Sequence, residues 1–528
     1  MRRRAVAHSS TICASLPPLH TARASLLHRL CTLPPLHTAF DIYNSPDSPV
    51  DAHVASRFEN IQQLTVHAPS HCIYTQGLQP TEKSSLNFFQ HWLLPLFLFL
   101  FVPHVVVCVI FFVVTYGSSL EEAFERGFQP FWYDAWTLHG LGTPQTWVFL
   151  ALFIAYSGLS LLVLPGKIYY GPPTSTGHRP VYRMSGFTYY VISMALAVFI
   201  LLVQDARGWS IYRTLPGVAV ALTIIGYVVT LLIYIKGKLW PSPGDHGTTG
   251  SFVFDIYWGL ELYPRIGQRL DVKQWTNCRF GMMLWQLLVL VCWKAQVETT
   301  GWNWAMATTA LLQTVYIAKF YWWEDGYMQT IDIIVDRAGY YICWGCICFL
   351  SLMYPLTSIY MVEHSPETGF LRAGLIFVVG LVMIGLNYWT DYQRQLVRAT
   401  QGKCVIWGSS PKVIKASYRD ATGKQRTNLL LASGFWSLSR HVNYVFEILA
   451  ALCWALPSGC SSVVPYCYVL YLCGLLVHRS YRDEEKCSTK YGHYWKQYCD
   501  LVREEKGGPN LDDGHDPMGP GGVFGLPY

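Results

Sequence analysis

The stretch from Phe88 to Tyr116 reads FFQHWLLPLFLFLFVPHVVVCVIFFVVTY and contains no Asp, Glu, Lys or Arg. An α-helix needs about 20 mainly apolar residues to cross the hydrocarbon core of a bilayer, which is roughly 30 Å thick. The prolines at 95 and 103 are compatible with such a helix, because neighbouring helices of a membrane bundle satisfy the freed backbone groups. The stretch therefore predicts a membrane-spanning helix.

Apolar stretches of this kind recur through the chain. Of its 528 residues 52% are hydrophobic and 14% are charged, whereas roughly 25% are charged in soluble globular proteins. The predicted spans are 88–116, 145–165, 187–204, 215–235, 280–293, 304–322, 339–361, 370–389, 443–457 and 462–477. The sequence thus predicts an all-α polytopic membrane bundle of about ten transmembrane helices. No Gly-x-Gly-x-x-Gly follows a predicted strand, so no Rossmann domain is expected.

The two ends of the chain differ from its apolar centre. Residues 1–84 open with three arginines after Met1, and the first 40 positions lack Asp and Glu. This composition is typical of a disordered extension or of a transit peptide. Residues 507–528, dense in Gly, Pro and Asp, predict a disordered tail. We therefore expect the functional domain to span 85–506, with residues 1–80 dispensable for catalysis.

Positive charge falls mainly in alternate loops. The segments rich in Lys and Arg are 166–186, 236–279, 390–442 and 478–506, whereas the loops between them are short or acidic. Because basic loops favour the cytosolic side, ten spans place both termini in the cytosol. The same distribution accounts for the net charge of +6 and argues against a nucleic-acid partner.

Polar residues gather near the spans in three stretches, at 255–269, 316–336 and 440–498. Ionisable groups near the bilayer are functional-site candidates by default. In the first stretch, aromatic residues alternate with two acids and an arginine. They indicate either a segment that lines a polar cavity or an aromatic belt with snorkelling charges.

The second stretch contains an acidic pair, Asp332 and Asp336, spaced i, i+4. On a helix the two carboxylates would share one face. Such a pair could hold a raised pKa and donate protons. Alternatively, these acids pair with Lys319 and Arg337 at the end of the bundle.

The third stretch, together with Arg394 and Arg398, brings many Lys and Arg side chains to the cytosolic mouth of apolar spans. Arginine forks suit phosphate because they bond it bidentately. A phosphorylated nucleotide such as NADPH fits this pattern, as does an anionic lipid headgroup. No metal site is expected, because Cys343-x-x-Cys346-x-Cys348 lacks a nearby His or a further Cys pair.

Two signatures resemble the integral-membrane sterol reductase family, which includes sterol carbon-14 reductases, the lamin B receptor and delta-7 sterol reductases. One runs from Gly250 to Arg265. The other reads Leu476-Val-His478-Arg479-x-x-Arg482-Asp483-x-x-x-Cys487-x-x-Lys490-Tyr491-Gly492. Trp407-Gly-x-x-Pro411-Lys-Val-Ile414-x-x-Ser417-Tyr418 is similar to the 7-dehydrocholesterol (delta-7) reductase branch, and Asn277-Cys-Arg-Phe-Gly-Met-Met283 to its plant-type members. The resemblance covers about 88–502.

The resemblance implies a set of site residues. Tyr316 and Asp483 correspond to the pair near the nicotinamide and the reacting double bond. The NADPH site, within about 390–506, is implied to include Arg394, Arg398, Leu431, Trp436, Asn443, Tyr444, Arg479, Asp483, Cys487, Ser488, Thr489, Lys490, Tyr491 and Tyr498.

The resemblance further implies NADPH-dependent reduction of the carbon 7–8 double bond of a 5,7-diene sterol, in the endoplasmic reticulum membrane. The sterol would enter from the bilayer and NADPH from the cytosol. An isolated alkene does not accept hydride readily, so an acid must first protonate carbon 8 to form an allylic cation, which a carboxylate can stabilise. The alternatives are a sterol carbon-14 reductase and a non-catalytic sterol-binding scaffold.

Overall fold

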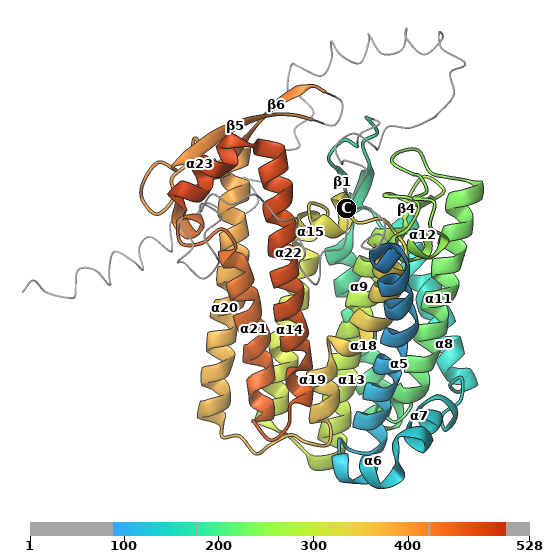
Figure 1. Ribbon diagram of the computed structural model, residues 1–528. Helices are drawn as coiled ribbons and strands as arrows, with labels where there is room; N and C mark the ends of the chain where they lie inside the picture. Colours follow the sequence, from blue (N-terminus) through green and yellow to red (C-terminus); the bar gives the residue numbers. More distant parts are fainter. Residues whose placement is uncertain (1–87, 175–176, 421–422, 503–528) are drawn as a thin grey trace, which may run out of the picture. The chain divides into compact units, whose positions relative to one another are not determined.

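The computed structural model describes residues 88–502, apart from 175–176 and 421–422 (Figure 1). The predicted extension at 1–84 and tail at 507–528 lie outside these residues. Helices make up most of the described chain. The long ones are α5 (Leu94–Thr115), α8 (Pro144–Val163), α9 (Gly186–Val198), α11 (Leu215–Leu239), α13 (Met282–Thr300), α14 (Trp304–Trp322), α20 (Phe370–Ala399), α21 (Val442–Ala455) and α22 (Cys467–Tyr491).

Shorter elements connect or extend the long helices. Wider π-helical turns precede α5 and α13 and follow α9; they are η1 (Phe89–Leu93), η3 (Gln274–Gly281) and η2 (Phe199–Val203). One apolar stretch is broken into α17 (Tyr340–Trp344), η4 (Gly345–Leu350), α18 (Ser351–Met353) and α19 (Leu356–Met361). The remaining short helices include α6 (Leu120–Arg126), α7 (Phe128–Thr137), α10 (Gly208–Tyr212), α12 (Phe252–Trp258), α15 (Glu324–Tyr327), α16 (Ile331–Ile334) and α23 (His493–Leu501).

The strands form three small antiparallel hairpins. They pair β1 (Lys167–Tyr170) with β2 (Val181–Met184), β3 (Arg265–Ile266) with β4 (Leu270–Asp271), and β5 (Val413–Arg419) with β6 (Gln425–Leu431). In the last hairpin Val413 lies opposite Leu431, and Arg419 lies opposite Gln425. The described residues contain no parallel sheet, in agreement with the expectation of a helical protein without a Rossmann domain.

Each of the ten predicted spans contains helix. Seven are long and apolar enough to cross a membrane: His91–Thr115, Pro144–Val163, Gly186–Val203, Leu215–Leu239, Gln274–Thr300, Tyr340–Met361 and Phe370–Ala399. A shorter apolar helix covers Val442–Ser458. The all-α membrane bundle is thus confirmed, and the exact number of ten crossings stays a prediction.

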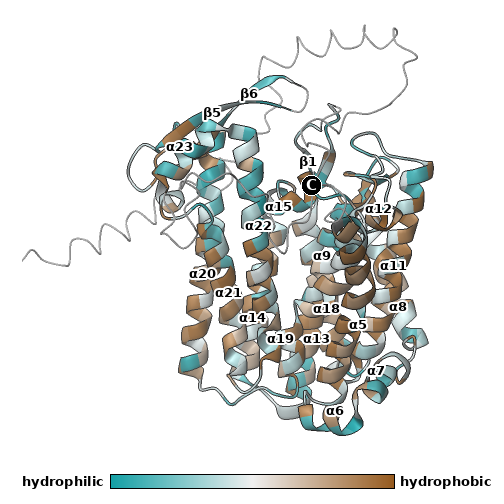
Figure 2. Ribbon diagram, in the orientation of Figure 1, coloured by the Kyte–Doolittle hydropathy of each residue, from teal (hydrophilic) through white to brown (hydrophobic). Residues whose placement is uncertain are grey.

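Helix α20 shows how one span divides its faces. Its exposed side chains recur every three or four residues, at Leu371, Leu375, Val378 and Val382, which forms a stripe suited to lipid. Its buried residues are Ala373, Gly380, Ile384 and Val397, together with the polar Asn387, Thr390 and Gln393. Figure 2 shows this apolar character along α20 and α21, and the more hydrophilic hairpin β5–β6 beyond them. These buried polar side chains therefore need hydrogen-bond partners inside the protein.

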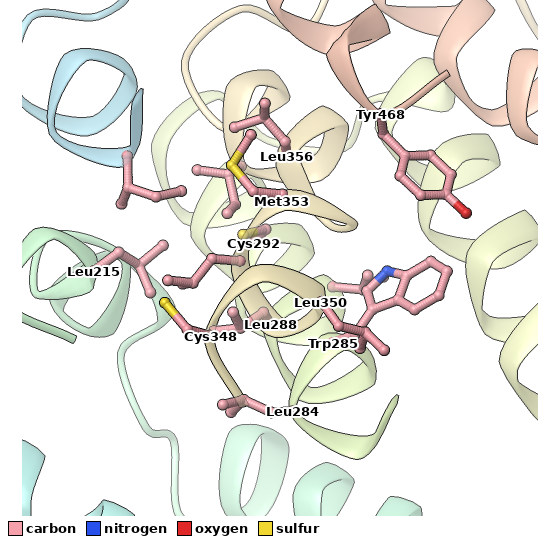
Figure 3. Packing of buried hydrophobic residues seen from close by; sticks show 14 of the residues in the cluster. Leu215, Leu284, Trp285, Leu288, Cys292, Cys348, Leu350, Met353, Leu356 and Tyr468 are labelled. Atoms are coloured by element: carbon pink, nitrogen blue, oxygen red, sulfur yellow. The ribbon is translucent and has the colours of Figure 1, made fainter. Parts of the chain in front are cut away.

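A continuous apolar core joins the helices. It includes Leu215 of α11, Trp285 and Leu288 of α13, Leu350 of η4 and Tyr468 of α22 (Figure 3). The rings of Trp285 and Tyr468 have centroids 6.1 Å apart. Because interiors pack as densely as organic crystals, such contacts fix the relative positions of the helices.

A buried ion pair joins η3 to the start of α15. Arg279 in η3 is 0% exposed and its Nη1 lies 2.6 Å from Oε1 of Glu324, which is 3% exposed. Glu324 also accepts hydrogen bonds from the Gly186 backbone N–H at 2.8 Å and from Nε2 of Gln274 at 2.9 Å. One carboxylate thus ties together the starts of α9, η3 and α15.

The predicted acidic pair takes different partners from those proposed. The carboxylate of Asp332 binds Nη2 of Arg479 at 2.7 and 2.9 Å, and Asp336 is paired with Arg482. The prediction that both acids form ion pairs is therefore confirmed, but the predicted partners, Lys319 and Arg337, are wrong. The two acids do not share a helix either, because α16 ends at Ile334.

The two acids of the first polar stretch, 255–269, are buried. Asp255 and Glu261 are both 2% exposed, so the snorkelling interpretation is wrong for them. Asp255 accepts from the backbone and the hydroxyl of Thr249 at 2.8 Å, and Glu261 accepts from Nζ of Lys236 at 2.8 Å. Gly259 follows with φ +103°, and a Cβ there would lie 2.5 Å from the backbone carbon of Ala338. Only glycine permits this close approach.

Candidate functional site

A cavity of about 230 Å³ lies among α20, β6, α22 and α23. Figure 1 shows these elements together at the upper end of α20 and α21. The side chains that line it are Gln329, Arg394, Arg398, Asn428, Leu430, Leu431, Trp436, Arg440, Asp483, Lys486, Cys487, Lys490, Tyr491, Trp495 and Tyr498. Their positions follow from helix and strand periodicity, since Asp483, Lys486 and Lys490 are spaced to lie on one face of α22.

The lining is strongly cationic. It contains five Lys or Arg side chains against one carboxylate, that of Asp483. Arg394 is paired with Asp391 at 3.0 Å and Arg440 with Glu484 at 3.3 Å. Within the described residues, Arg398, Lys486 and Lys490 have no carboxylate at ion-pair distance, and Nε of Arg398 is buried without a hydrogen-bond partner. Three cations are therefore available to an anionic ligand.

Aromatic rings form another part of the wall. The guanidinium carbon of Arg394 lies 4.5 Å from the ring centroid of Trp436, whose Nε1 donates to the Thr390 carbonyl at 2.8 Å. Tyr491 accepts from Nδ2 of Asn428 at 2.8 Å. Burial raises the pKa of Tyr498 to about 12, so its hydroxyl remains a hydrogen-bond donor at neutral pH. Cations and aromatic rings together suit a ligand with phosphate groups and planar bases.

The cavity includes nine of the residues that the resemblance names: Arg394, Arg398, Leu431, Trp436, Asp483, Cys487, Lys490, Tyr491 and Tyr498. Six other lining residues were not predicted as cofactor ligands: Gln329, Asn428, Leu430, Arg440, Lys486 and Trp495. Helical spacing from Asp483 and Lys490 could have indicated Lys486. Gln329 comes from a segment between α15 and α16; it lies within the polar stretch 316–336, but nothing in that stretch indicated a contact with the cofactor.

The other five predicted ligands do not line the cavity. Arg479 is held by Asp332. The Asn443 carbonyl accepts from Nδ2 of Asn387 at 3.0 Å, and Tyr444 stacks on the ring of His441. Ser488 and Thr489 lie on an exposed face of α22. A role for these five in cofactor binding stays a prediction.

Tyr316 lies deeper in the bundle, on α14. Its ring centroid is 5.8 Å from that of Trp285 and 5.3 Å from that of Trp454. Its hydroxyl donates a hydrogen bond to Oε1 of Glu447 on α21, whereas Asp483, its predicted partner, lines the cavity. Sequence reasoning missed Glu447, although an acid inside the predicted span 443–457 is the signal that marks a functional candidate.

Polar side chains connect Tyr316 with the cavity. Nζ of Lys319 lies 5.0 Å from the ring centroid of Tyr316 and 2.5 Å from Oδ1 of Asn387. Asn387 donates to the Asn443 carbonyl, and Nδ2 of Asn443 lies 3.5 Å from Oδ1 of Asp391. Since Asp391 is paired with Arg394, this polar series runs from the ammonium beside the Tyr316 ring to the lining of the cavity.

Comparison with known proteins gives the family. The model described as the ergosterol biosynthesis ERG4/ERG24 family matches residues 94–505. The 7-dehydrocholesterol reductase of Arabidopsis thaliana is 39% identical over 410 residues, which cover 76% of this chain and 94% of the relative. A probable 7-dehydrocholesterol reductase of Acanthamoeba polyphaga mimivirus is 30% identical, covering 77% and 92%. The Delta(14)-sterol reductase TM7SF2 of Mus musculus is 32% identical, covering 67% and 84%. With most of its length matched, the chain belongs to the ERG4/ERG24 family of sterol reductases.

Proposed function

We propose that the protein reduces the carbon 7–8 double bond of a 5,7-diene sterol with NADPH. The observation that carries the proposal is the cationic cavity, from which a series of polar side chains leads to Lys319 beside the ring of Tyr316. The relative from Arabidopsis thaliana, named a 7-dehydrocholesterol reductase, is more similar to this chain than the mouse Delta(14)-sterol reductase. This difference favours the carbon 7–8 bond.

The residues of the cavity fit NADPH. Arg398, Lys486 and Lys490 lack carboxylate partners within the described residues and would hold its phosphates, and Trp436 and Tyr498 would contact its planar rings. When bound, NADPH supplies the hydride for carbon 7. Asp483 is the one carboxylate of the lining, and its charge would stabilise the cationic sterol.

Tyr316 would provide the proton for carbon 8. Its ring packs against Trp285 and Trp454, and its hydroxyl is its one polar group. Protonation at carbon 8 of a 5,7-diene leaves a delocalised allylic cation, which costs less than a localised one. The sterol would reach this depth from the bilayer.

A product assay tests the function. Membranes that contain the protein are incubated with NADPH and either 7-dehydrocholesterol or a delta-8,14 sterol, and the products are identified by mass spectrometry. We expect reduction of the 5,7-diene. Conversion of the delta-8,14 sterol alone would assign carbon-14 reduction instead, and no conversion of either sterol would favour a sterol-binding scaffold.

Replacing Arg398 with alanine should raise the KM for NADPH by roughly 10–100-fold with little change in kcat. The reason is that a charge-assisted hydrogen bond contributes about 1.5–3 kcal/mol and a phosphate contact is made equally in ground and transition states. Steady-state kinetics at saturating sterol measure both constants. Arg419→Ala is the matched control, because Arg419 is exposed at the end of β5 and does not line the cavity. A lower kcat at unchanged KM would contradict phosphate binding by Arg398.

The proposal includes the endoplasmic reticulum membrane, with the cavity on the cytosolic side. The segments 390–442 and 478–506, which supply most of the lining, are rich in Lys and Arg, as cytosolic loops are. A glycosylation acceptor introduced into 362–369 should be modified, and one introduced into 400–412 should not. The reverse pattern would overturn this orientation.

A further inference from the structure

The hydrogen bond between Tyr316 and Glu447 joins two helices in the apolar bundle. Glu447 lies on α21 among apolar residues, and within the described chain it has no ion-pair partner. Three other acids named above differ, since Glu324, Asp332 and Asp336 each pair with an arginine. Glu447 therefore contacts the hydroxyl of Tyr316 without an arginine that would fix its charge.

A phenol that protonates carbon is left as a phenolate, so each turnover needs a group that restores its proton. The carboxyl of Glu447 is already hydrogen-bonded to the phenol oxygen. Proton transfer requires donor and acceptor within hydrogen-bond reach, and the two oxygens of this pair meet that condition once the hydroxyl hydrogen has turned to the sterol. The Lys319 ammonium, 5.0 Å from the ring centroid of Tyr316, would stabilise the phenolate electrostatically.

We infer that Glu447 is the positioning residue that orients the Tyr316 hydroxyl and returns its proton during sterol reduction. The inference rests on the proposed function. In the step, the Tyr316 O–H bond breaks and a C–H bond forms at carbon 8, while the Glu447 carboxylic O–H breaks and the Tyr316 O–H forms again. The electron pair of the new C–H bond at carbon 7 comes with the hydride, and the Glu447 carboxylate then takes its proton from water.

The polar series described above indicates the side of the bundle from which Glu447 takes up its proton. Asn387, Asn443 and Asp391 lie between the ammonium of Lys319 and Arg394 of the cavity. Polar groups can hold water between them, whereas the Trp285 and Trp454 rings that pack on Tyr316 offer mainly carbon surface. Proton uptake would therefore come from the end of the bundle that holds the cationic cavity.

A double-mutant cycle tests the inference. Single-turnover rates are measured at saturating NADPH and 7-dehydrocholesterol for Glu447→Gln, Tyr316→Phe and the combined variant, and NADPH affinity is measured by fluorescence titration. We expect Glu447→Gln to lower the rate by roughly 10²-fold, with NADPH affinity within about twofold of the wild type. Residues that act as a unit are not additive, so the combined variant should be no slower than Tyr316→Phe alone.

Two further variants separate a relay from a structural contact. Glu447→Asp keeps an acid and should recover at least about tenfold over Glu447→Gln, and Glu367→Gln, an exposed change of the same chemistry, should match the wild type. Losses that multiply in the combined variant, a wild-type rate for Glu447→Gln, or no recovery by aspartate would each overturn the relay. Wild-type protein that reduces neither sterol would instead overturn the proposed function, and the relay with it.

Discussion

Tyr316→Phe should lower turnover on 7-dehydrocholesterol by roughly 10²–10⁴-fold, the usual contribution of a general acid. Phenylalanine keeps the ring and therefore its packing against Trp285 and Trp454. It removes only the hydroxyl that donates to Glu447. Because the loss concerns the transition state, kcat should fall while the KM for NADPH remains near its wild-type value.

The matched control is Tyr321→Phe on the same helix. Tyr321 is 1% exposed and, among the described residues, its hydroxyl has no hydrogen-bond partner, so its removal should leave turnover almost unchanged. If purified Tyr316→Phe turns over at the wild-type rate when saturated with both substrates, Tyr316 is not the proton donor. The search would then turn to Asp483 in the cavity, because Glu324, Asp332 and Asp336 are engaged with arginines.

Arg279→Met should lower the free energy of unfolding by about 3–5 kcal/mol, because removing one partner of a buried pair leaves the other charge uncompensated. Here Glu324 would keep only its neutral donors, the Gly186 N–H and the Gln274 amide. The loss of stability is measured as a shift in the denaturant or thermal transition of the detergent-solubilised protein.

Two further variants test whether that loss of stability comes from the uncompensated buried charge. Arg279→Met combined with Glu324→Gln removes both charges and should recover much of the loss. Arg126→Met breaks the pair with Asp134, in which Arg126 is 52% exposed, and should cost much less stability than Arg279→Met. An Arg279→Met protein as stable as the wild type would show that this buried pair contributes little.

Hydropathy predicted the helices because a helix that crosses a bilayer needs a long apolar stretch, which is easily recognised in the sequence. Spans such as 370–389 agree with the helices observed, although α20 continues to Ala399, since its last turns are polar and lie beyond the apolar stretch. The β5–β6 hairpin was not predicted. Its strands are short and mixed in polarity, and their order depends on contacts with α22 and α23 that are distant in sequence.

The candidate site was predictable only where residues lie near one another in the chain. Asp483, Cys487 and Lys490 share one helical segment and one cavity. The partners of Asp332 and Asp336 lie 147 and 146 residues away, and local spacing contains no information about such pairs. Glu447 was visible as an acid in an apolar stretch, but only the packing of α14 against α21 brings it to Tyr316.

The two partners of the buried pair Arg279–Glu324 are synthesised at different times. The two residues are 45 positions apart, and at about 5–20 residues per second the arginine is made roughly 2–9 s before its carboxylate. Throughout that interval the guanidinium has no counter-ion from Glu324, and α14 has yet to follow α13. The buried position of Arg279 therefore gains its balancing charge only after residue 324 has been made, so this part of the bundle reaches its final electrostatics late in the synthesis of α13 to α15.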